Sequence, residues 1–251
     1  MRHEKPRPDA GGGSDQTMID PRHMGTGVHA SLAHEIGQRI VRGDYPPRSI
    51  LPNEAQWTET FGVSRSAVRE AIKILMAKGL LASRPKIGSR VEPRERWNLL
   101  DRDVLGWYAM SPNKGAFLRS VQEFRYIIEP EATALAAARR SDEQMTEISE
   151  ALRGMAEAPS LMERTAADTR FHLAILRASG NELLVPLGAL IESAFVQLFS
   201  FTSRDEQGLQ HALKLHQNIE RNIRLQRPAA ARAAVRKLLA NTDRIIGASG
   251  G

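Results

Sequence analysis

The 251-residue sequence contains no cysteine, no long apolar run and no secretion pattern at its N-terminus. The absence of cysteine excludes disulfides and thiolate metal sites, so any bound metal must use histidine and carboxylate ligands. No apolar run approaches the roughly 20 residues that a membrane-spanning helix needs. A secretory signal would require a charged segment followed by an apolar one, and none is found. These absences predict a cytoplasmic protein that does not associate with membranes.

Positive charge is abundant, but it is concentrated in one short stretch of the chain. Between Ser64 and Arg90, seven basic residues accompany a single acid, Glu70, so this stretch alone carries the net charge of the whole chain, +6. The basic residues are Arg65, Arg69, Lys73, Lys78, Arg84, Lys86 and Arg90. A block of one charge sign is typical of a surface that binds a polyanion. We therefore expect double-stranded DNA as a partner.

The N-terminal part of the chain has the element order of a winged helix-turn-helix. Residues 1–25 are rich in glycine and proline and lack apolar periodicity, which predicts a disordered tail. From Val28 an apolar residue recurs every fourth position as far as Ile40, as in an amphipathic helix. We expect helices at 28–43, 53–60 and 64–78, followed by strands at 80–83 and 89–92. Residues 26–93 are thus predicted to form a DNA-binding domain.

The rest of the chain is predicted to be helical, which makes the protein mainly α. Residues 94–112 are expected to form a linker with one short helix at 101–108. Residues 113–247 show helical periodicity throughout, with expected helices at 115–139, 142–157, 160–178, 181–202, 204–225 and 228–246. Short connections favour antiparallel neighbours. We expect an all-α bundle that binds an effector and dimerises.

The helix at 64–78 combines a packing face with a row of cations. Val68, Ala71, Ile72 and Leu75 form one apolar stripe, while Arg65, Arg69 and Lys73 occupy an adjacent face. The free N–H groups and the hydroxyls of Ser64 and Ser66 at its start suit phosphate oxygens, and arginine can read guanine in the major groove. In the hairpin that follows, Arg84, Lys86, Gly88 and Arg90 are candidates for contact with a phosphate or the minor groove. The alternative for all of these is an ordinary solvated surface.

Three residues of the helical part form a candidate metal site. Asp168 and His172 are four residues apart and share a helix face with Leu161, Ile175 and Leu176; His216 lies among Leu209, Leu213 and Ile223. Two inward histidines and an aspartate can hold a divalent ion such as Zn, Ni or Mn. Arg125, at the edge of an apolar stripe that contains Phe117, Val121, Phe124 and Ile128, is a candidate clamp for an effector carboxylate. The alternatives are a satisfied Asp–His hydrogen bond in the core and a plain ion pair for Arg125.

The N-terminal motif resembles the DNA-binding signature of GntR-type bacterial regulators. The resemblance rests on Leu51-Pro52-Asn53-Glu54, on residues 61–71 (FGVSRSAVREA), and on Gly88-Ser89-Arg90-Val91. It implies DNA contacts by Ser64, Arg65, Ser66, Arg69 and the wing. Ala55 stands where the family often has a DNA-contacting arginine.

The C-terminal part resembles the FadR-type branch of this family, whose helical effector domain is called FCD. Arg125 and Glu129-Pro130-Glu131 match its opening helix, and Asp168, His172 and His216 match three of its metal ligands. A further histidine that is common in the branch is replaced by Leu238. The segment 96–107 resembles the repressors of galactonate operons, which implies a sugar-acid effector.

Together these features predict a repressor of sugar-acid catabolism that leaves its operator when a small carboxylate such as galactonate binds. A regulator that responds to another hydroxy acid, of the lactate or gluconate type, is the alternative within this class. A metalloenzyme is disfavoured because the sequence lacks a His-Glu-x-x-His motif and a phosphate-binding glycine loop. A purely architectural DNA binder would leave the inward polar cluster unexplained. We expect a homodimer on a two-fold operator.

Overall fold

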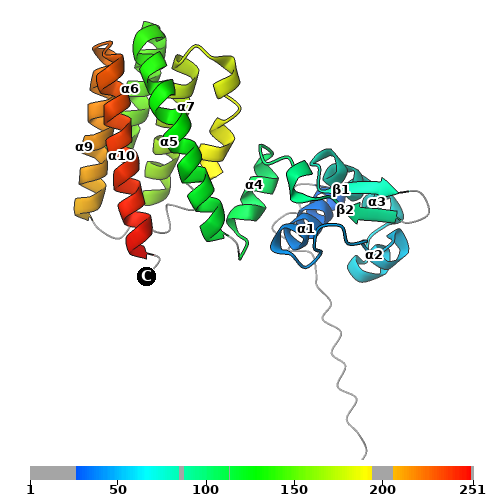
Figure 1. Ribbon diagram of the computed structural model, residues 1–251. Coiled ribbons are helices and arrows are strands. Elements are labelled where there is room, and N and C mark those ends of the chain that lie inside the picture. Colours follow the sequence, from blue (N-terminus) through cyan, green and yellow to red (C-terminus); the bar gives the residue numbers. More distant parts are fainter. Residues whose placement is uncertain (1–26, 85–87, 113, 194–205, 250–251) are drawn as a thin grey trace, which may run out of the picture. The chain divides into compact units, whose positions relative to one another are not determined.

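The computed structural model describes residues 27–84, 88–112, 114–193 and 206–249, and it divides the chain into two compact units (Figure 1). Within these described residues, the first unit comprises 27–40, 45–84 and 88–96, and the second comprises 41–44, 97–112, 114–193 and 206–249. The predicted tail at 1–25 lies outside the described residues. None of the described helices is both long enough and apolar enough to cross a membrane.

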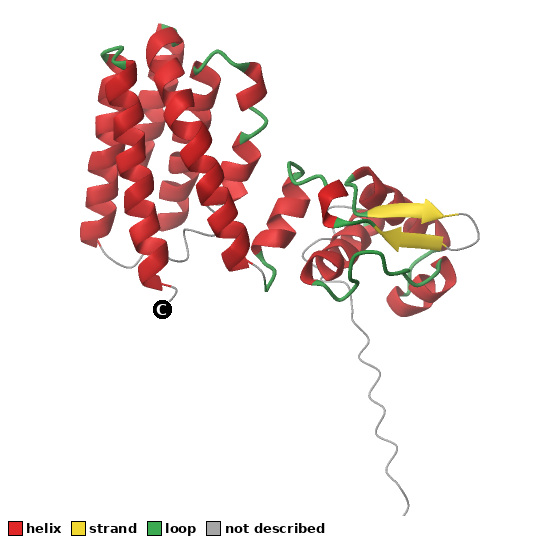
Figure 2. Ribbon diagram, in the orientation of Figure 1, coloured by secondary structure: helices red, strands yellow, loops and turns green. Residues whose placement is uncertain are grey.

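The first unit contains three helices and a β-hairpin, in the predicted order (Figure 2). Its elements are α1 (Val28–Arg42), α2 (Glu54–Phe61), α3 (Arg65–Ala77), β1 (Leu81–Arg84), β2 (Gly88–Val91) and the short 3₁₀ turn η2 (Arg94–Arg96). The two strands pair antiparallel, with Leu81 opposite Val91 and Arg84 opposite Gly88. The helix boundaries fall within one or two residues of those expected, and each strand is displaced by one residue.

Local signals set the helix-turn-helix boundaries. Asn53 caps α2 through a capping box with Gln56, and Ser64 caps α3 by accepting a hydrogen bond from the Ala67 N–H. Between them Gly62 adopts a left-handed conformation (φ 63°) that ends α2, a geometry that glycine adopts without steric cost. The turn between α2 and α3 is therefore determined by the few residues from 62 to 64.

The core of this unit lies where the predicted stripes meet. Leu32, Ile36 and Ile40 of α1 are buried, as are Val68 and Leu75 of α3. Val28, the first apolar residue of the predicted pattern, is 56% exposed and lies outside this core. It is the first residue of α1.

A third segment, missed from the sequence, joins the hairpin. Ile50 forms a bridge with Arg90, and the Leu51 N–H donates to the Ser89 carbonyl over 2.9 Å. The Val91 N–H in turn donates to the Ser49 carbonyl. The segment is too short for alternation to be visible, and it follows Pro46 and Pro47. Strand β2 therefore has hydrogen-bonding partners on both of its edges, β1 on one and residues 48–51 on the other.

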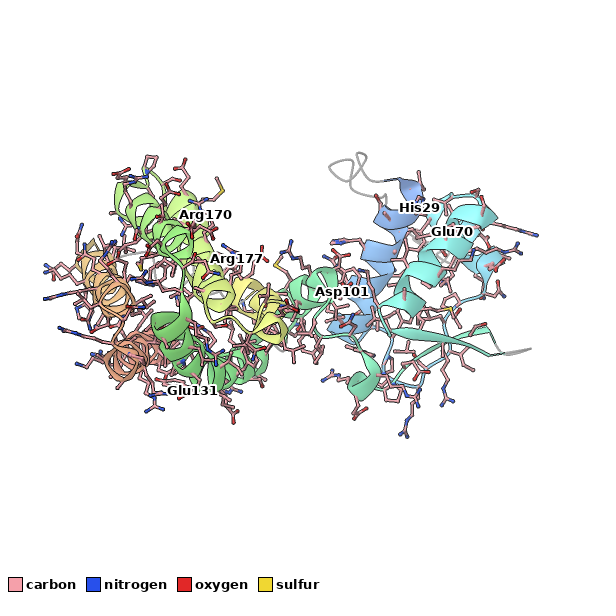
Figure 3. All side chains as sticks on the ribbon, turned by 90° about the horizontal axis from the view of Figure 1, so that it is seen from above. His29, Glu70, Asp101, Glu131, Arg170 and Arg177 are labelled. Carbon is pink, nitrogen blue, oxygen red and sulfur yellow. The ribbon has the colours of Figure 1, made fainter. Side chains whose placement is uncertain are left out.

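The second unit is a helical bundle. Its elements are α4 (Arg102–Ala109), α5 (Lys114–Arg139), α6 (Asp142–Glu157), α7 (Leu161–Ala178), η3 (Glu182–Leu184), α9 (Glu206–Arg224) and α10 (Pro228–Ser249). Figure 3 shows these helices nearly end-on, with Glu131 and Arg170 on the outside. Helix α5 packs against α7, α9 and α10, and α6 packs against α7 and α9. Their shared core includes Ile148, Phe171, Ile223 and Leu239.

The helix expected at 181–202 does not begin at residue 181. The chain first forms η3, which Asn181 caps, and helical structure resumes at 188 and continues through 193; the remainder of the expected helix lies outside the described residues. Pro186 explains the difference, because a helix that began at 181 would place this residue beyond its first turn. There the ring would clash with the preceding turn and the Pro nitrogen could not donate a hydrogen bond.

Polar contacts tie α5 to α10 along their length. The Arg232 guanidinium binds the Glu131 carboxylate with two hydrogen bonds of 2.6 and 2.7 Å, and the Tyr126 hydroxyl donates to Asp243 over 2.7 Å. With α10 on one side and α7 on another, α5 is held so that its middle faces the interior of the bundle.

Candidate functional sites

The N-terminus of α3 forms the first candidate site. The Ser64 and Ser66 hydroxyl oxygens lie 2.9 Å apart at the start of the helix, and both residues are exposed. Arg65 is exposed beside them, while Val68, Ala71 and Leu75 are fully buried on the opposite face. The predicted division of α3 into a packing face and an exposed face is therefore confirmed. Ile72, which was predicted in the same stripe, is only partly buried.

Two of the candidate DNA contacts pair with acids in the chain. Both carboxylate oxygens of Glu54, on α2, accept hydrogen bonds from the Arg69 Nε at 2.9 and 3.0 Å, and Lys73 donates to Glu70. The Arg69 and Lys73 side chains remain 64% and 70% exposed. Exposed pairs of this kind contribute about 0–1 kcal/mol, so a phosphate can replace the acid at little cost.

The hairpin forms the other part of this candidate site. Gly88 begins β2 with φ 99°, a conformation that favours glycine. The Arg90 Nε donates to the Arg48 carbonyl over 2.8 Å, which fixes the base of this exposed side chain. Lys86 and the side chain of Arg84 lie outside the described residues, so their predicted role stays a prediction.

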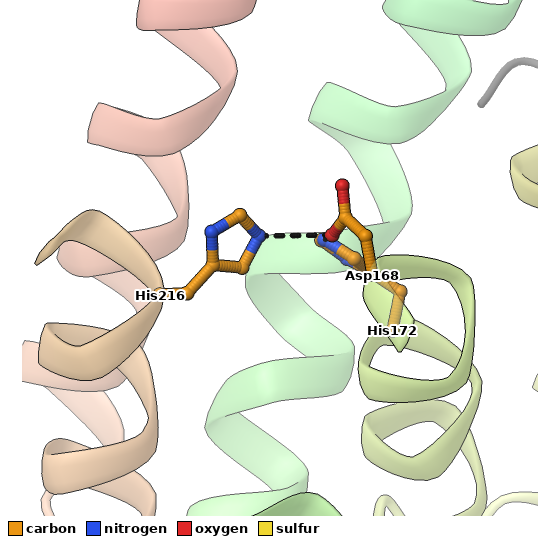
Figure 4. Close-up of side chains that lie close together, drawn as sticks. All are labelled: Asp168, His172 and His216. Atoms are coloured by element: carbon orange, nitrogen blue, oxygen red, sulfur yellow. Dashed lines mark ion pairs between the residues drawn. The ribbon is translucent and has the colours of Figure 1, made fainter. Parts of the chain in front are cut away.

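The second candidate site is the polar cluster that Asp168, His172 and His216 form inside the bundle (Figure 4). Asp168 and His172 occupy successive turns of α7, and His216 reaches them from α9. The Asp168 Oδ1 lies 3.0 Å from the His216 Nε2 and 3.4 Å from the His172 Nε2. Both histidines are buried, whereas Asp168 is 24% exposed. The buried ring of Phe171 contacts both imidazoles edge-on.

The donor atoms of this cluster fit a divalent cation. One candidate ligand atom from each residue lies within 4.8 Å of the others. Within the described part of the chain, neither the His216 Nε2 nor the Asp168 Oδ1 has a hydrogen bond of acceptable geometry, although both atoms are buried. Buried polar atoms are rarely left in this state. Two imidazole nitrogens and one carboxylate oxygen are ligands that suit Zn, Ni or Mn.

Strong electrostatic coupling accompanies this geometry. Burial alone would raise the pKa of Asp168, but its interactions with His216 and His172 hold that pKa well below its usual range. Burial alone would lower the pKa of His172, but the carboxylates of Glu129 and Asp168 raise it to about 9. The pKa of Glu129 falls to about 2 because Arg125 and His172 outweigh the effect of burial. These shifts favour the charged forms.

Arg125 lies deeper than predicted. Its side chain is 1% exposed rather than at the edge of the apolar stripe, and its Nε donates to the Glu129 Oε1 over 2.5 Å. The plain ion pair with a helix neighbour is thus formed, and a contact of Arg125 with an effector stays a prediction.

Sequence reasoning missed two polar residues of this neighbourhood. Glu129 lies 2.9 Å from the His172 Nδ1 through its Oε2, and Gln122 accepts a hydrogen bond from Arg125. A signal was present, because residues 122, 125 and 129 share one helical face. Leu238, at the place of the family's further histidine, is buried in the apolar core.

Comparison with known families accounts for both units. The family described as bacterial regulatory proteins, gntR family, matches residues 29–91, and the FCD domain family matches residues 120–241. The sequence is 35% identical over 216 residues to the HTH-type transcriptional regulator YieP of Escherichia coli, covering 85% of this chain and 93% of YieP. It is 34% identical over 213 residues to the galactonate operon transcriptional repressor of the same organism, covering 83% and 92%.

Solved structures support the fold. Lar of Listeria monocytogenes aligns over 88% of this chain and 96% of its own, with a TM-score of 0.61 and 18% identity. E. coli McbR/YncC aligns over 89% and 99%, with a TM-score of 0.51 and 16% identity.

Proposed function

Because this chain belongs to the gntR family of bacterial regulatory proteins and carries an FCD domain, we propose that it is a repressor that leaves its operator when a sugar acid binds that domain. Its relatives are transcriptional regulators rather than enzymes. Operator DNA and a small-molecule effector are the partners that the two domains imply. The site of action would be the cytoplasm.

The proposal that the FCD domain binds an effector is supported by one observation. Asp168, His172 and His216 lie close together inside the bundle. A divalent ion on these three residues would offer open coordination positions to oxygen ligands. The partly exposed Asp168 marks the side from which a ligand enters, since both histidines are buried.

A sugar acid suits this site because it carries a carboxylate beside a hydroxyl group, both of which are oxygen ligands. A buried cation, Arg125, lies beyond His172 and is paired with Glu129, which contacts both residues. The relative that is 34% identical is named a galactonate operon repressor, which makes galactonate the first compound to test. Lactate and gluconate, the alternative hydroxy acids, belong in the same assay.

The proposal that the first unit binds operator DNA is supported by the exposed face of α3 and by the wing. We assign phosphate and base contacts to Ser64, Arg65, Ser66, Arg69 and Lys73, with Arg84, Lys86, Gly88 and Arg90 completing the surface. The acids that pair with Arg69 and Lys73 would be exchanged for phosphates on binding.

The decisive experiment replaces the histidines. His172→Ala and His216→Ala should each abolish metal binding and the release of DNA by galactonate, while operator affinity survives, because both residues lie in the unit that does not carry the basic block. Elemental analysis measures the metal, and gel-shift titration with and without galactonate measures the response.

His211→Ala is the matched control, because this exposed histidine also belongs to α9. It should leave both metal content and effector response unchanged. A wild-type protein without metal, together with normal release of DNA in both site variants, would refute the proposal. If the histidine variants lose thermal stability but still release DNA when galactonate is added, the histidines only stabilise the core.

A further inference from the structure

A continuous chain of buried polar contacts leads from the His172 imidazole across α5 to the backbone of α10. The Glu129 Oε2 lies 2.9 Å from the His172 Nδ1, and the Glu129 Oε1 accepts from the Arg125 Nε over 2.5 Å. Arg125 then donates to the Gln122 Oε1 over 3.3 Å, and Gln122 donates to the Leu239 carbonyl over 3.2 Å. All four side chains are 6% exposed or less.

We propose that Glu129 is a positioning residue, which holds the His172 ring by its Nδ1 so that Nε2 faces Asp168 and His216. An imidazole can bind a metal through either nitrogen, and the partner of the other nitrogen sets both the tautomer and the ring orientation. Here the carboxylate occupies the Nδ1 side, and Nε2 is the atom directed at Asp168, 3.4 Å away. This inference rests on the proposed metal site.

The two oxygens of the Glu129 carboxylate have different neighbours, which supports this role. Each oxygen faces its own charged neighbour: Oε1 accepts a hydrogen bond from the Arg125 Nε, and Oε2 lies at ion-pair distance from the His172 Nδ1, although the described residues give Oε2 no hydrogen bond of acceptable geometry. Rotation of the carboxylate would separate one of these pairs. Arg125 is itself held by Gln122, which is anchored on α10. The orientation of the imidazole is therefore determined from outside α7, by α5, which packs against α7 and is tied to α10.

The simpler alternative is that Glu129 only neutralises the buried Arg125. If that were its only role, replacing Glu129 would lower the stability of the fold. The protein that remains folded would still bind metal with wild-type affinity. The two roles can be separated because the structure offers a second buried glutamate. Glu220 on α9 pairs with Arg224, four residues later, and accepts a hydrogen bond from Ser149.

The test compares Glu129→Gln with Glu220→Gln in the full-length protein. Zn²⁺ affinity is measured by competition with a chromophoric chelator, and thermal unfolding is measured in excess chelator. We expect Glu129→Gln to weaken Zn²⁺ binding about 10- to 100-fold, as the loss of such a partner typically does. Glu220→Gln should destabilise the metal-free protein without changing Zn²⁺ affinity.

A double variant keeps the test valid if Glu129→Gln does not fold. Arg125→Met combined with Glu129→Gln removes the whole buried ion pair and leaves no uncompensated charge, a change that proteins often tolerate. It should show the same loss of Zn²⁺ affinity. In the Zn²⁺-loaded wild type, ¹⁵N NMR should report a proton on the His172 Nδ1.

Wild-type Zn²⁺ affinity in either Glu129 variant, or a proton on Nε2 of His172, would overturn the inference. If instead His172→Ala and His216→Ala retain the metal, the proposed site itself fails. The two failures are thus distinguishable.

Discussion

At the scale of single residues, the interior of the bundle contains a charged cluster where apolar side chains would be expected. Glu129 and Arg125 are almost completely buried, and the His172 side chain adjoins them. Buried charges are retained only when they are paired, because removing them from water costs several kcal/mol per ion. The cluster therefore makes the stability of this unit depend on pH.

The metal-free protein should lose stability as the pH rises from about 6.5 to about 9. His172 has an ordinary pKa of 6.5, raised in the fold to about 9, so the folded chain keeps a proton that the unfolded chain releases in this range. The stabilisation is fully present below pH 6.5 and is lost as the pH reaches the folded value. Thermal unfolding in chelator, compared with His172→Gln, measures it. The prediction is contradicted if the difference in melting temperature between wild type and His172→Gln stays the same across this pH range.

Arg65→Ala and Arg69→Ala should each weaken operator binding without unfolding the protein, since neither side chain belongs to the buried face of α3. A base contact would cost about 1–3 kcal/mol, concentrated at one operator position. Gel-shift titration at fixed salt measures the loss. Arg177→Ala, an exposed arginine of the helical unit, serves as the control and should bind normally. Unchanged affinity in the α3 variants would remove these residues from the DNA surface.

At the scale of elements, helix ends decide how the bundle turns from one helix to the next. Ser141 and Ser160 cap α6 and α7 through their side chains, as expected of residues at these positions. The end of α9 is different. The Arg227 N–H donates to the Asn222 carbonyl over 2.9 Å, and Gln226 adopts a left-handed φ of 51° where glycine is the usual residue.

Gln226→Gly should therefore stabilise the protein, by about 0.5–1 kcal/mol, because glycine adopts the left-handed conformation without the Cβ clash but gains entropy in the unfolded chain. Chemical denaturation measures the change. Gln226→Ala is the control and should give no gain, since alanine retains the Cβ. A glycine variant no more stable than the alanine variant would show that this turn carries no strain.

At the scale of the whole molecule, the chain joins a DNA-binding unit to an effector-binding unit, and one copy supplies one α3. A single recognition helix contacts only a few base pairs, so affinity for an operator requires a second copy. We predict a homodimer on a two-fold-related operator. Light scattering should give twice the chain mass of 27.8 kDa. A monomer that binds one half-site tightly would refute this.

Much of the fold, and the three residues of the candidate metal site, could be predicted from the sequence. Asn53, Ser64 and Asp101 cap helices by accepting hydrogen bonds from backbone N–H groups no more than three residues later in the chain. The Asp168–His172 pair requires only one turn of helix. Signals of this kind depend on neighbours along the chain, so a sequence pattern contains them. Pro186 is such a signal as well, because a proline beyond the first turn excludes the expected helix start at 181.

The sequence by itself determined the helix caps, the apolar faces, the basic block and the inward direction of three candidate ligands. Only the tertiary structure decided that His216 of α9 meets α7 at Asp168, that Glu129 contacts His172, and that Ile50 joins the hairpin at Arg90. The physical reason is the range of the forces involved. Capping and periodicity act within a turn or two of helix, whereas the register between helices depends on how whole side-chain surfaces pack.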